Sequence, residues 1–329
     1  MSAMPRSDLP LQDLLEYRCS TPEPQDLDAF WERTLAENAH PLDVRLEPVE
    51  TGLTLVDTFD VTFSGYGGAP IRAWLHLPAG RSGPLPVVVQ FHGYSGGRGL
   101  AHQMAPWPLA GYAHLTVDTR GQGWSNGGHE PTPDPEPSAP HHPGSMTQGI
   151  QSPDTYFYRR VYTDAVRALQ VAASLEATDA ERVAVVGGSQ GGAITIAAAG
   201  LAPKVGLRLR AAMPDVPFLC DFRRALDVAT SGPYLEIERY LHTFRGREEE
   251  ALATLDHFDG VHLARRAECP TLFSVGLLDT TCPPSTVFGA YAGWGAEDKQ
   301  IKVYPFNNHE GGEGYHQRRQ LSWLAERLA

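Results

Sequence analysis

Apolar positions along the chain follow two patterns, which change near residue 85. Residues 46–78 alternate between apolar and polar side chains and contain glycine-rich turns, a pattern typical of antiparallel hairpins. From residue 85 onward, short continuous apolar runs alternate with helical stretches, which indicates a parallel sheet covered on both faces. These runs predict strands at Leu85–Phe91, His114–Asp118, Arg182–Gly187, Leu209–Met213, Thr271–Val275 and Gln300–Tyr304. The pattern therefore predicts an α/β fold with a doubly wound, mostly parallel sheet.

Helical spacing is clearest at residues 158–175, where Val161, Ala165 and Leu169 belong to one buried stripe. The remaining helical patterns are shorter and are bounded by proline, glycine or polar residues. They predict helices at Leu9–Tyr17, Asp26–Asn38, Pro233–Phe244, Glu248–Asp256 and Gly314–Leu328.

We interpret residues 1–329 as a single domain with three additions to the sheet. Residues 1–84 form a helical and antiparallel N-terminal extension in this interpretation. Residues 124–152 are a loop rich in proline, glycine and histidine that is too long for a mere connection. Residues 214–266 form a helical insertion after a late strand, where insertions commonly cover the cleft at the carboxyl ends of the strands. We therefore expect insertions over the active site.

Composition and charge exclude several classes of partner. The chain has 27 Lys and Arg residues against 39 Asp and Glu residues, a net charge of −12, and no basic stripe, which argues against nucleic acid. No apolar run reaches transmembrane length, and residues 1–8 lack the apolar segment of a signal peptide. The cysteines lack Cys-x-x-Cys spacing and are interpreted as free thiols: Cys19, Cys220, Cys269 and Cys282. We expect a cytoplasmic protein without a nucleic-acid or membrane partner.

The strongest chemical signal is Gly-x-Ser-x-Gly at residues 187–191, between a buried strand and an alanine-rich helical pattern. In a nucleophile elbow, this arrangement exposes the serine hydroxyl on a strained turn between strand and helix. Ser189 is therefore a candidate nucleophile. The alternative is a glycine-rich turn with a solvated serine.

A serine nucleophile needs a base, and the base needs a carboxylate that orients it. In folds with this elbow, the three residues occur in the order serine, acid, histidine. Asp279 follows the predicted strand Thr271–Val275, and His309 follows the predicted strand Gln300–Tyr304. The sequence therefore predicts a triad of Ser189, Asp279 and His309.

Other polar residues are weaker candidates. Asp215 follows a strand and is an alternative acid, although a structural or pocket role is favoured. His316 and the pair His129–Glu130 are interpreted as surface residues. The pair His141–His142 has no carboxylate or cysteine at metal-ligand spacing, so we expect a solvated loop and no metal site.

An oxyanion intermediate needs two hydrogen-bond donors. The N–H of Gln190 follows the nucleophile, and the glycine-rich segment 92–97 follows the first parallel strand. We select the N–H of Tyr94 as the second donor, although His92-Gly93 could also form an ordinary turn. Arg120 directly follows a buried strand and is expected to brace neighbouring loops.

Together these motifs closely resemble carbohydrate esterase family 7, the acetyl xylan esterase and cephalosporin C deacetylase group. The matching signatures are Arg120-Gly121-Gln122, Gly187-Gly188-Ser189-Gln190-Gly191 and His309-Glu310, and further stretches match at residues 90–99 and 158–165. The likeness extends from about residue 10 over nearly the whole chain.

The resemblance implies an α/β-hydrolase fold that removes acetyl groups from acetylated xylo-oligosaccharides, other acetylated sugars and cephalosporin C. It implies the same triad, the Tyr94 and Gln190 oxyanion hole, no cofactor, and a homohexamer built as a dimer of trimers. Arg120, Gln122 and Glu310 are expected to support the site structurally.

Two other classes of function remain as alternatives. One is a serine hydrolase with a broader acyl range, or a peptidase of the prolyl-oligopeptidase kind, although residues 1–80 are too short for the propeller of such peptidases. The other is a non-catalytic α/β scaffold, which a complete set of triad and oxyanion candidates disfavours. The loop at 124–152 departs from the family pattern, so the resemblance does not define substrate preference.

Overall fold

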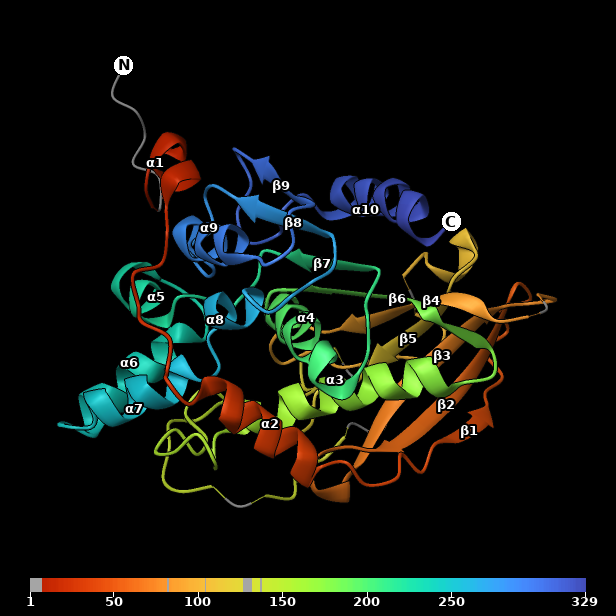
Figure 1. Ribbon diagram of the computed structural model, residues 1–329, viewed down its shortest axis with the longest axis horizontal. Helices are drawn as coiled ribbons and strands as arrows, with labels where there is room; N and C mark the ends of the chain where they lie inside the picture. Colours follow the sequence, from red (N-terminus) through yellow and green to blue (C-terminus); the bar gives the residue numbers. More distant parts are fainter. Residues whose placement is uncertain (1–7, 82, 104, 127–131, 137) are drawn as a thin grey trace.

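A twisted sheet passes through the molecule, and Ser189, Asp279 and His309 each follow one of its strands (Figure 1). The computed structural model describes residues 8–329 except 82, 104, 127–131 and 137. In this part of the chain the sheet has nine strands in the order β1-β2-β3-β5-β4-β6-β7-β8-β9. Their bounds are β1 Arg45–Pro48, β2 Val56–Ser64, β3 Pro70–Pro78, β4 Leu85–Phe91, β5 Ala113–Val117, β6 Thr178–Gly188, β7 Ala211–Asp215, β8 Thr271–Gly276 and β9 Lys299–Tyr304.

The strand directions divide the sheet into two parts. Strands β1, β2 and β3 pair antiparallel, and β3 also pairs antiparallel with β5. The strands from β5 across to β9 are parallel to one another. The carboxyl ends of β4, β6, β7, β8 and β9 therefore meet at one edge, which is the edge where α/β proteins place their ligands. This arrangement confirms the predicted α/β fold with a mostly parallel sheet.

Helices cover both faces of the sheet. Helices α3 and α4 pack on one face over the larger apolar core, and α10 covers the other with Trp323, Leu324 and Leu328 (Figure 1). None of the helices in the described ranges is both long and apolar enough to cross a membrane. The helix bounds are α1 Leu11–Glu16, α2 Leu27–Glu37, α3 Phe157–Ser174, α4 Gln190–Leu201, α5 Phe222–Val228, α6 Tyr234–Thr243, α7 Glu248–Asp256, α8 Gly260–Ala264, α9 Pro284–Gly293 and α10 Glu313–Leu328.

The predicted elements agree with the structure where burial is strong. Strand β4 and helix α7 have the predicted bounds, and the other parallel strands differ at their ends by a few residues. Four of the strands and α-helices given above had no predicted counterpart: β1, α5, α8 and α9. The short helices α5 and α8 lie in the insertion that was predicted only as helical. Strand β1 is exposed along its whole length and so lacks an apolar alternation. Helix α9 is buried at most positions, so it has no polar face to mark its period, and its proline lies in the first turn, where a missing N–H is tolerated.

All four cysteines are free thiols, as the sequence predicted. Burial raises the pKa of the Cys220 and Cys282 thiols well above the ordinary value, because a thiolate there would be poorly solvated.

Two buried histidines lie side by side on the α10 face of the sheet. His76 on β3 is directly opposite His114 on β5, and their rings stack with centroids 5.5 Å apart. His114 Nε2 bonds Gln90 Oε1 at 3.0 Å. Burial, with a further contribution from His76, holds the pKa of His114 well below its usual 6.5. Burial also lowers the pKa of His76, so both rings are neutral in the folded protein at neutral pH.

We expect this pair to make the protein less stable as pH falls from 7 to 5. A histidine whose pKa is lowered in the folded protein binds fewer protons there than in the unfolded chain, so each of the two rings loses stabilisation as pH falls, by at most about 2 kcal/mol over this range. Urea unfolding at both pH values should show a smaller loss in His114→Gln than in the wild type. The exposed His102 provides the control His102→Gln. Equal pH dependence in all three proteins would contradict this account.

Candidate active site

Ser189 occupies the turn between β6 and α4 with a backbone conformation that few non-glycine residues adopt. Its φ is 57° and its ψ is −118°. Its N–H donates to the Asp215 carbonyl at 2.9 Å, and its carbonyl accepts from the Phe218 N–H at 2.9 Å. A strained conformation of this kind persists only where its surroundings hold it, and such residues cluster at functional sites.

The flanking glycines allow the turn to close. A Cβ atom at Gly187 would lie 2.4 Å from the carbonyl carbon of Gly191, and one at Gly191 would lie 2.4 Å from the Phe91 carbonyl oxygen. Both distances are far shorter than any van der Waals contact, so larger residues would push β6, α4 and the end of β4 apart. The glycines in Gly-x-Ser-x-Gly thus have a steric role.

The three predicted triad residues form one hydrogen-bonded chain. His309 Nε2 lies 3.0 Å from Ser189 Oγ, and His309 Nδ1 lies 2.8 Å from Asp279 Oδ2. The serine precedes α4, the aspartate follows β8 and the histidine follows β9. When Nδ1 donates to the carboxylate, Nε2 is left to accept the serine proton. The arrangement is that of a nucleophile, a general base and an orienting acid.

Asp279 is held by the backbone that follows it. Its side chain is fully buried, and Oδ1 accepts from the N–H groups of Thr281 and Cys282, each at 2.8 Å. These bonds satisfy Oδ1 in the interior and leave Oδ2 to bond the imidazole.

A metal ion fits this cluster poorly. Ligand atoms of Asp279, Cys282 and His309 lie within 4.8 Å of one another. However, the aspartate oxygens already accept hydrogen bonds from backbone and imidazole, and burial keeps the Cys282 thiol protonated. A thiol must lose its proton to bind a metal, so the donor set favours proton transfer over coordination.

The two candidate oxyanion donors belong to two segments next to the nucleophile. Gln190 is the first residue of α4, and Tyr94 lies on the loop after β4. A Cβ atom at Gly93 would be 3.8 Å from the Gly188 carbonyl oxygen, which places this loop directly against the elbow. The positive end of α4 adds to the field at the same point.

Gln122 connects both sides of this oxyanion region. Its Oε1 accepts from the Ser95 N–H at 2.8 Å and from Gln190 Nε2 at 3.1 Å, while its own Nε2 donates to Gln190 Oε1 at 2.9 Å. The Tyr158 hydroxyl donates to the same Gln190 oxygen at 2.8 Å. The amide of Gln122 therefore holds the loop after β4 against the start of α4.

Arg120 pairs with carboxylates and does not contact the triad. Its side chain is fully buried, and Nε and Nη2 bind the two oxygens of Asp164 at 2.6 and 2.8 Å. Asp134 on the 124–152 loop lies 3.3 Å from Nη1, and Asp164 also accepts the Tyr66 N–H at 2.7 Å. Arg120 thus braces three segments around α3.

Glu310 stabilises the turn that contains His309. It is exposed and accepts from Asn307 Nδ2 at 2.9 Å and from the Asn308 N–H at 3.1 Å. Glu310 contacts this turn, whereas Asp279 is the carboxylate that bonds the imidazole.

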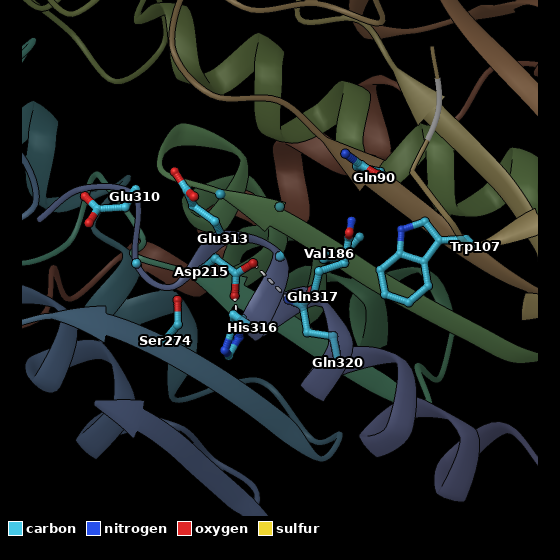
Figure 2. Close-up of a pocket in the computed structure, with 14 residues that line it drawn as sticks. Gln90, Trp107, Val186, Asp215, Ser274, Glu310, Glu313, His316, Gln317 and Gln320 are labelled. Atoms are coloured by element: carbon cyan, nitrogen blue, oxygen red, sulfur yellow. Dashed lines mark hydrogen bonds and ion pairs between the residues drawn. The ribbon is translucent and has the colours of Figure 1, made fainter. Parts of the chain in front are cut away.

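The remaining candidates lie elsewhere. His316 was expected at the surface, but it is buried, with Nε2 2.9 Å from Asp215 Oδ1 and Nδ1 3.0 Å from the Tyr304 hydroxyl. Gln320 donates to Asp215 Oδ2 at 2.8 Å. Helix α10 turns this polar face toward the sheet. Residues of α10 and of the ends of β6 and β7 line a cavity of about 270 Å³ there (Figure 2). Asp215 is therefore bound to α10 and does not orient His309.

His141 and His142 contact the backbone of their own loop. His141 Nδ1 and His142 Nδ1 lie 3.0 and 2.9 Å from the carbonyl oxygens of Ala139 and Pro143. His129 and Glu130 lie outside the described residues.

The sheet and the hydrogen-bonded serine, histidine and aspartate at its carboxyl edge define an α/β-hydrolase. The sequence model of the acetyl xylan esterase family (AXE1) matches residues 4–327. The chain belongs to this family, as the sequence motifs predicted.

Solved structures agree with this assignment. The acetyl xylan esterase from Paenibacillus sp. R4 is 38% identical, with a TM-score of 0.90 over 97% of this chain and 100% of the other. Acetyl xylan esterase 1 from Thermoanaerobacterium sp. JW/SL YS485 is 31% identical, with a TM-score of 0.88 over 98% and 100%. A prolyl endopeptidase, at 19% identity and a TM-score of 0.58, shares only the fold.

A curated relative is longer than this chain. The acetyl esterase Axe7A of Xylanibacter ruminicola is 30% identical over 297 residues, which cover 88% of this chain. The chain spans 64% of the length of that relative.

Replacing Gln122 should impair turnover more than substrate binding. Gln122→Ala removes three hydrogen bonds that align the proposed oxyanion donors, so kcat for p-nitrophenyl acetate should fall about 10- to 100-fold, with KM changed less than threefold. Gln300→Ala, at an exposed position on β9, is the matched control. A folded Gln122→Ala enzyme with wild-type kcat would refute this role.

Proposed function

We propose that the protein is a serine esterase that removes acetyl groups from acetylated xylo-oligosaccharides, other acetylated sugars and cephalosporin C. The observation that carries this proposal is the hydrogen-bonded chain from Ser189 through His309 to Asp279. Family membership supports an acetyl ester substrate, and the names of the related esterases point to xylan.

The first half-reaction acetylates the enzyme. Ser189 Oγ attacks the acetyl carbonyl carbon while His309 Nε2 takes the hydroxyl proton, and the carbonyl electrons move onto oxygen. The N–H groups of Tyr94 and Gln190 stabilise this oxyanion, and buried Asp279 stabilises the imidazolium. As the tetrahedral intermediate collapses, the bond to the sugar oxygen breaks and His309 returns the proton to that oxygen. The products are a free sugar hydroxyl and acetyl-Ser189.

The second half-reaction repeats these steps with water. His309 removes a proton from water, whose oxygen attacks the acetyl carbon, and the same two N–H groups hold the new oxyanion. Collapse breaks the bond to Ser189 Oγ, which receives the proton back from His309. Acetate leaves, and the free enzyme is restored.

An exposed tryptophan beside the oxyanion loop supports a carbohydrate substrate. Trp124 is 60% exposed, and its ring meets the Tyr94 ring edge to face with centroids 6.0 Å apart. An indole held in this way offers a flat apolar surface to the C–H groups of a sugar ring. We propose that Trp124 contacts the sugar while the acetyl group reaches Ser189.

A chain-length series tests the proposed reaction. We expect p-nitrophenyl acetate to react faster than the butyrate, and the octanoate to react slowest, because each methylene that a small acyl pocket excludes costs about 1–3 kcal/mol. Ser189→Ala should reduce kcat for acetate by at least about 10⁴-fold. Full activity in Ser189→Ala would refute the mechanism. Preference for octanoate would refute the deacetylase assignment and favour the esterase of broader acyl range.

The role of Trp124 is tested with a substrate that contains sugar rings. Trp124→Ala should raise KM for an acetylated xylo-oligosaccharide about 5- to 10-fold, as expected when one aromatic contact is lost. The increase should be smaller for p-nitrophenyl acetate, which has no sugar ring. Tyr315→Ala, at another exposed aromatic residue, is the control. Equal increases for both substrates would show that the indole does not contact the sugar.

Two further expectations remain untested. The homohexamer that the resemblance implies stays a prediction. Hydrolysis of peptides stays an alternative function. The likeness to a prolyl endopeptidase extends to the fold alone and does not decide between the two.

A further inference from the structure

A half-buried carboxylate outside the triad binds the phenol of Tyr94. Glu236 lies on α6, in the 214–266 insertion, and its Oε1 and Oε2 accept from the Tyr94 hydroxyl at 2.8 and 3.0 Å. Burial raises the pKa of Glu236, and the Tyr94 hydroxyl and the Met146 N–H oppose this rise by bonding the charged form. A largely desolvated carboxylate is costly unless it is hydrogen-bonded, so this contact is specific.

The 124–152 loop completes the same network. The Ser145 N–H donates to the Tyr94 hydroxyl, and the Met146 N–H donates to Glu236 Oε2 at 3.1 Å. Gly144 precedes them with a φ of +119°, and a Cβ atom there would lie 2.1 Å from Glu236 Oε2. Only glycine satisfies both the backbone conformation and the close approach.

The network also reaches the second oxyanion residue. The Tyr156 hydroxyl donates to the Met146 carbonyl at 3.0 Å, and the Tyr158 hydroxyl lies 3.5 Å from Met146 Sδ. Tyr158 is the residue that donates to Gln190 Oε1. A continuous series of contacts therefore links Glu236 to both residues whose N–H groups are the proposed oxyanion donors.

The loop that contains Tyr94 needs such anchors. It leaves β4 without regular structure, and Ser95 has a φ of +68°, so contacts from other segments must hold its backbone. The N–H groups of Gly123 and Ser125 donate to the Ser95 carbonyl at 3.2 and 3.1 Å, and side chains supply the remaining anchors. Gln122 holds this loop at the Ser95 N–H, and Glu236 holds it at the end of the Tyr94 side chain. The two anchors hold Tyr94 at its side chain and at the peptide that follows it, and so restrain the preceding peptide, which carries the Tyr94 N–H.

We propose that Glu236 is a positioning residue that acts through the Tyr94 phenol to align the Tyr94 N–H with the oxyanion. This proposal rests on the proposed function. In this role the helical insertion and the 124–152 loop together complete the oxyanion hole.

The proposal is tested by kinetics on p-nitrophenyl acetate with Glu236→Ala, Tyr94→Phe and the double variant. Each single variant should lower kcat about 10- to 100-fold and change KM less than threefold, because a displaced donor weakens only the transition state. The double variant should be no slower than the slower single variant, because both changes break the same contact. Glu236→Gln, which keeps one acceptor oxygen, should recover part of the lost kcat.

The matched control is Glu238→Gln, an exposed glutamate on the same helix, which should have wild-type kinetics. If Glu236→Ala does not fold, the kinetics of Tyr94→Phe test the proposal alone, because this change keeps the ring and removes only the hydroxyl. A folded Tyr94→Phe or Glu236→Ala enzyme with kcat within twofold of wild type would overturn the proposal, as would losses that multiply in the double variant. Absence of esterase activity in the wild type would instead count against the proposed function.

Discussion

The positive φ of Ser189 is the constraint on which the rest of the site depends. A positive φ at a serine costs on the order of 1–3 kcal/mol, and it persists because neighbouring segments hold both sides of the residue. The Asp215 carbonyl and the Phe218 N–H bind the serine backbone, and the flanking glycines let Phe91 approach. The strained turn thus connects the ends of β4, β6 and β7 and directs Oγ toward His309.

Around this turn, polar side chains from distant segments bind one another inside the protein. Gln122 and Gln190 exchange two amide hydrogen bonds, and Arg120 and Asp164 form a buried bidentate pair. Networks of this kind add rigidity when every member has a partner, and each member is costly to remove alone. They explain how loops without regular structure can present backbone N–H groups at defined positions.

The additions to the sheet take part in this organisation. The 124–152 loop contributes Asp134 to the Arg120 cluster and Met146 to the Glu236 network. The 214–266 insertion contributes Glu236 itself. Variation in these segments therefore changes the contacts that hold the loop of Tyr94.

The sequence by itself determined the parallel strands, the elbow at Ser189 and the order of Ser189, Asp279 and His309, because burial and glycine sterics leave strong local patterns. It misplaced His316, since one histidine in an amphipathic helix does not reveal which face meets the sheet. Only the tertiary structure decided which buried polar groups are partners. Glu236 and Tyr94 are 142 residues apart, and no periodicity or motif connects them. Hydrogen bonds between residues so far apart in the chain depend on how separate segments pack against one another, which local sequence does not encode.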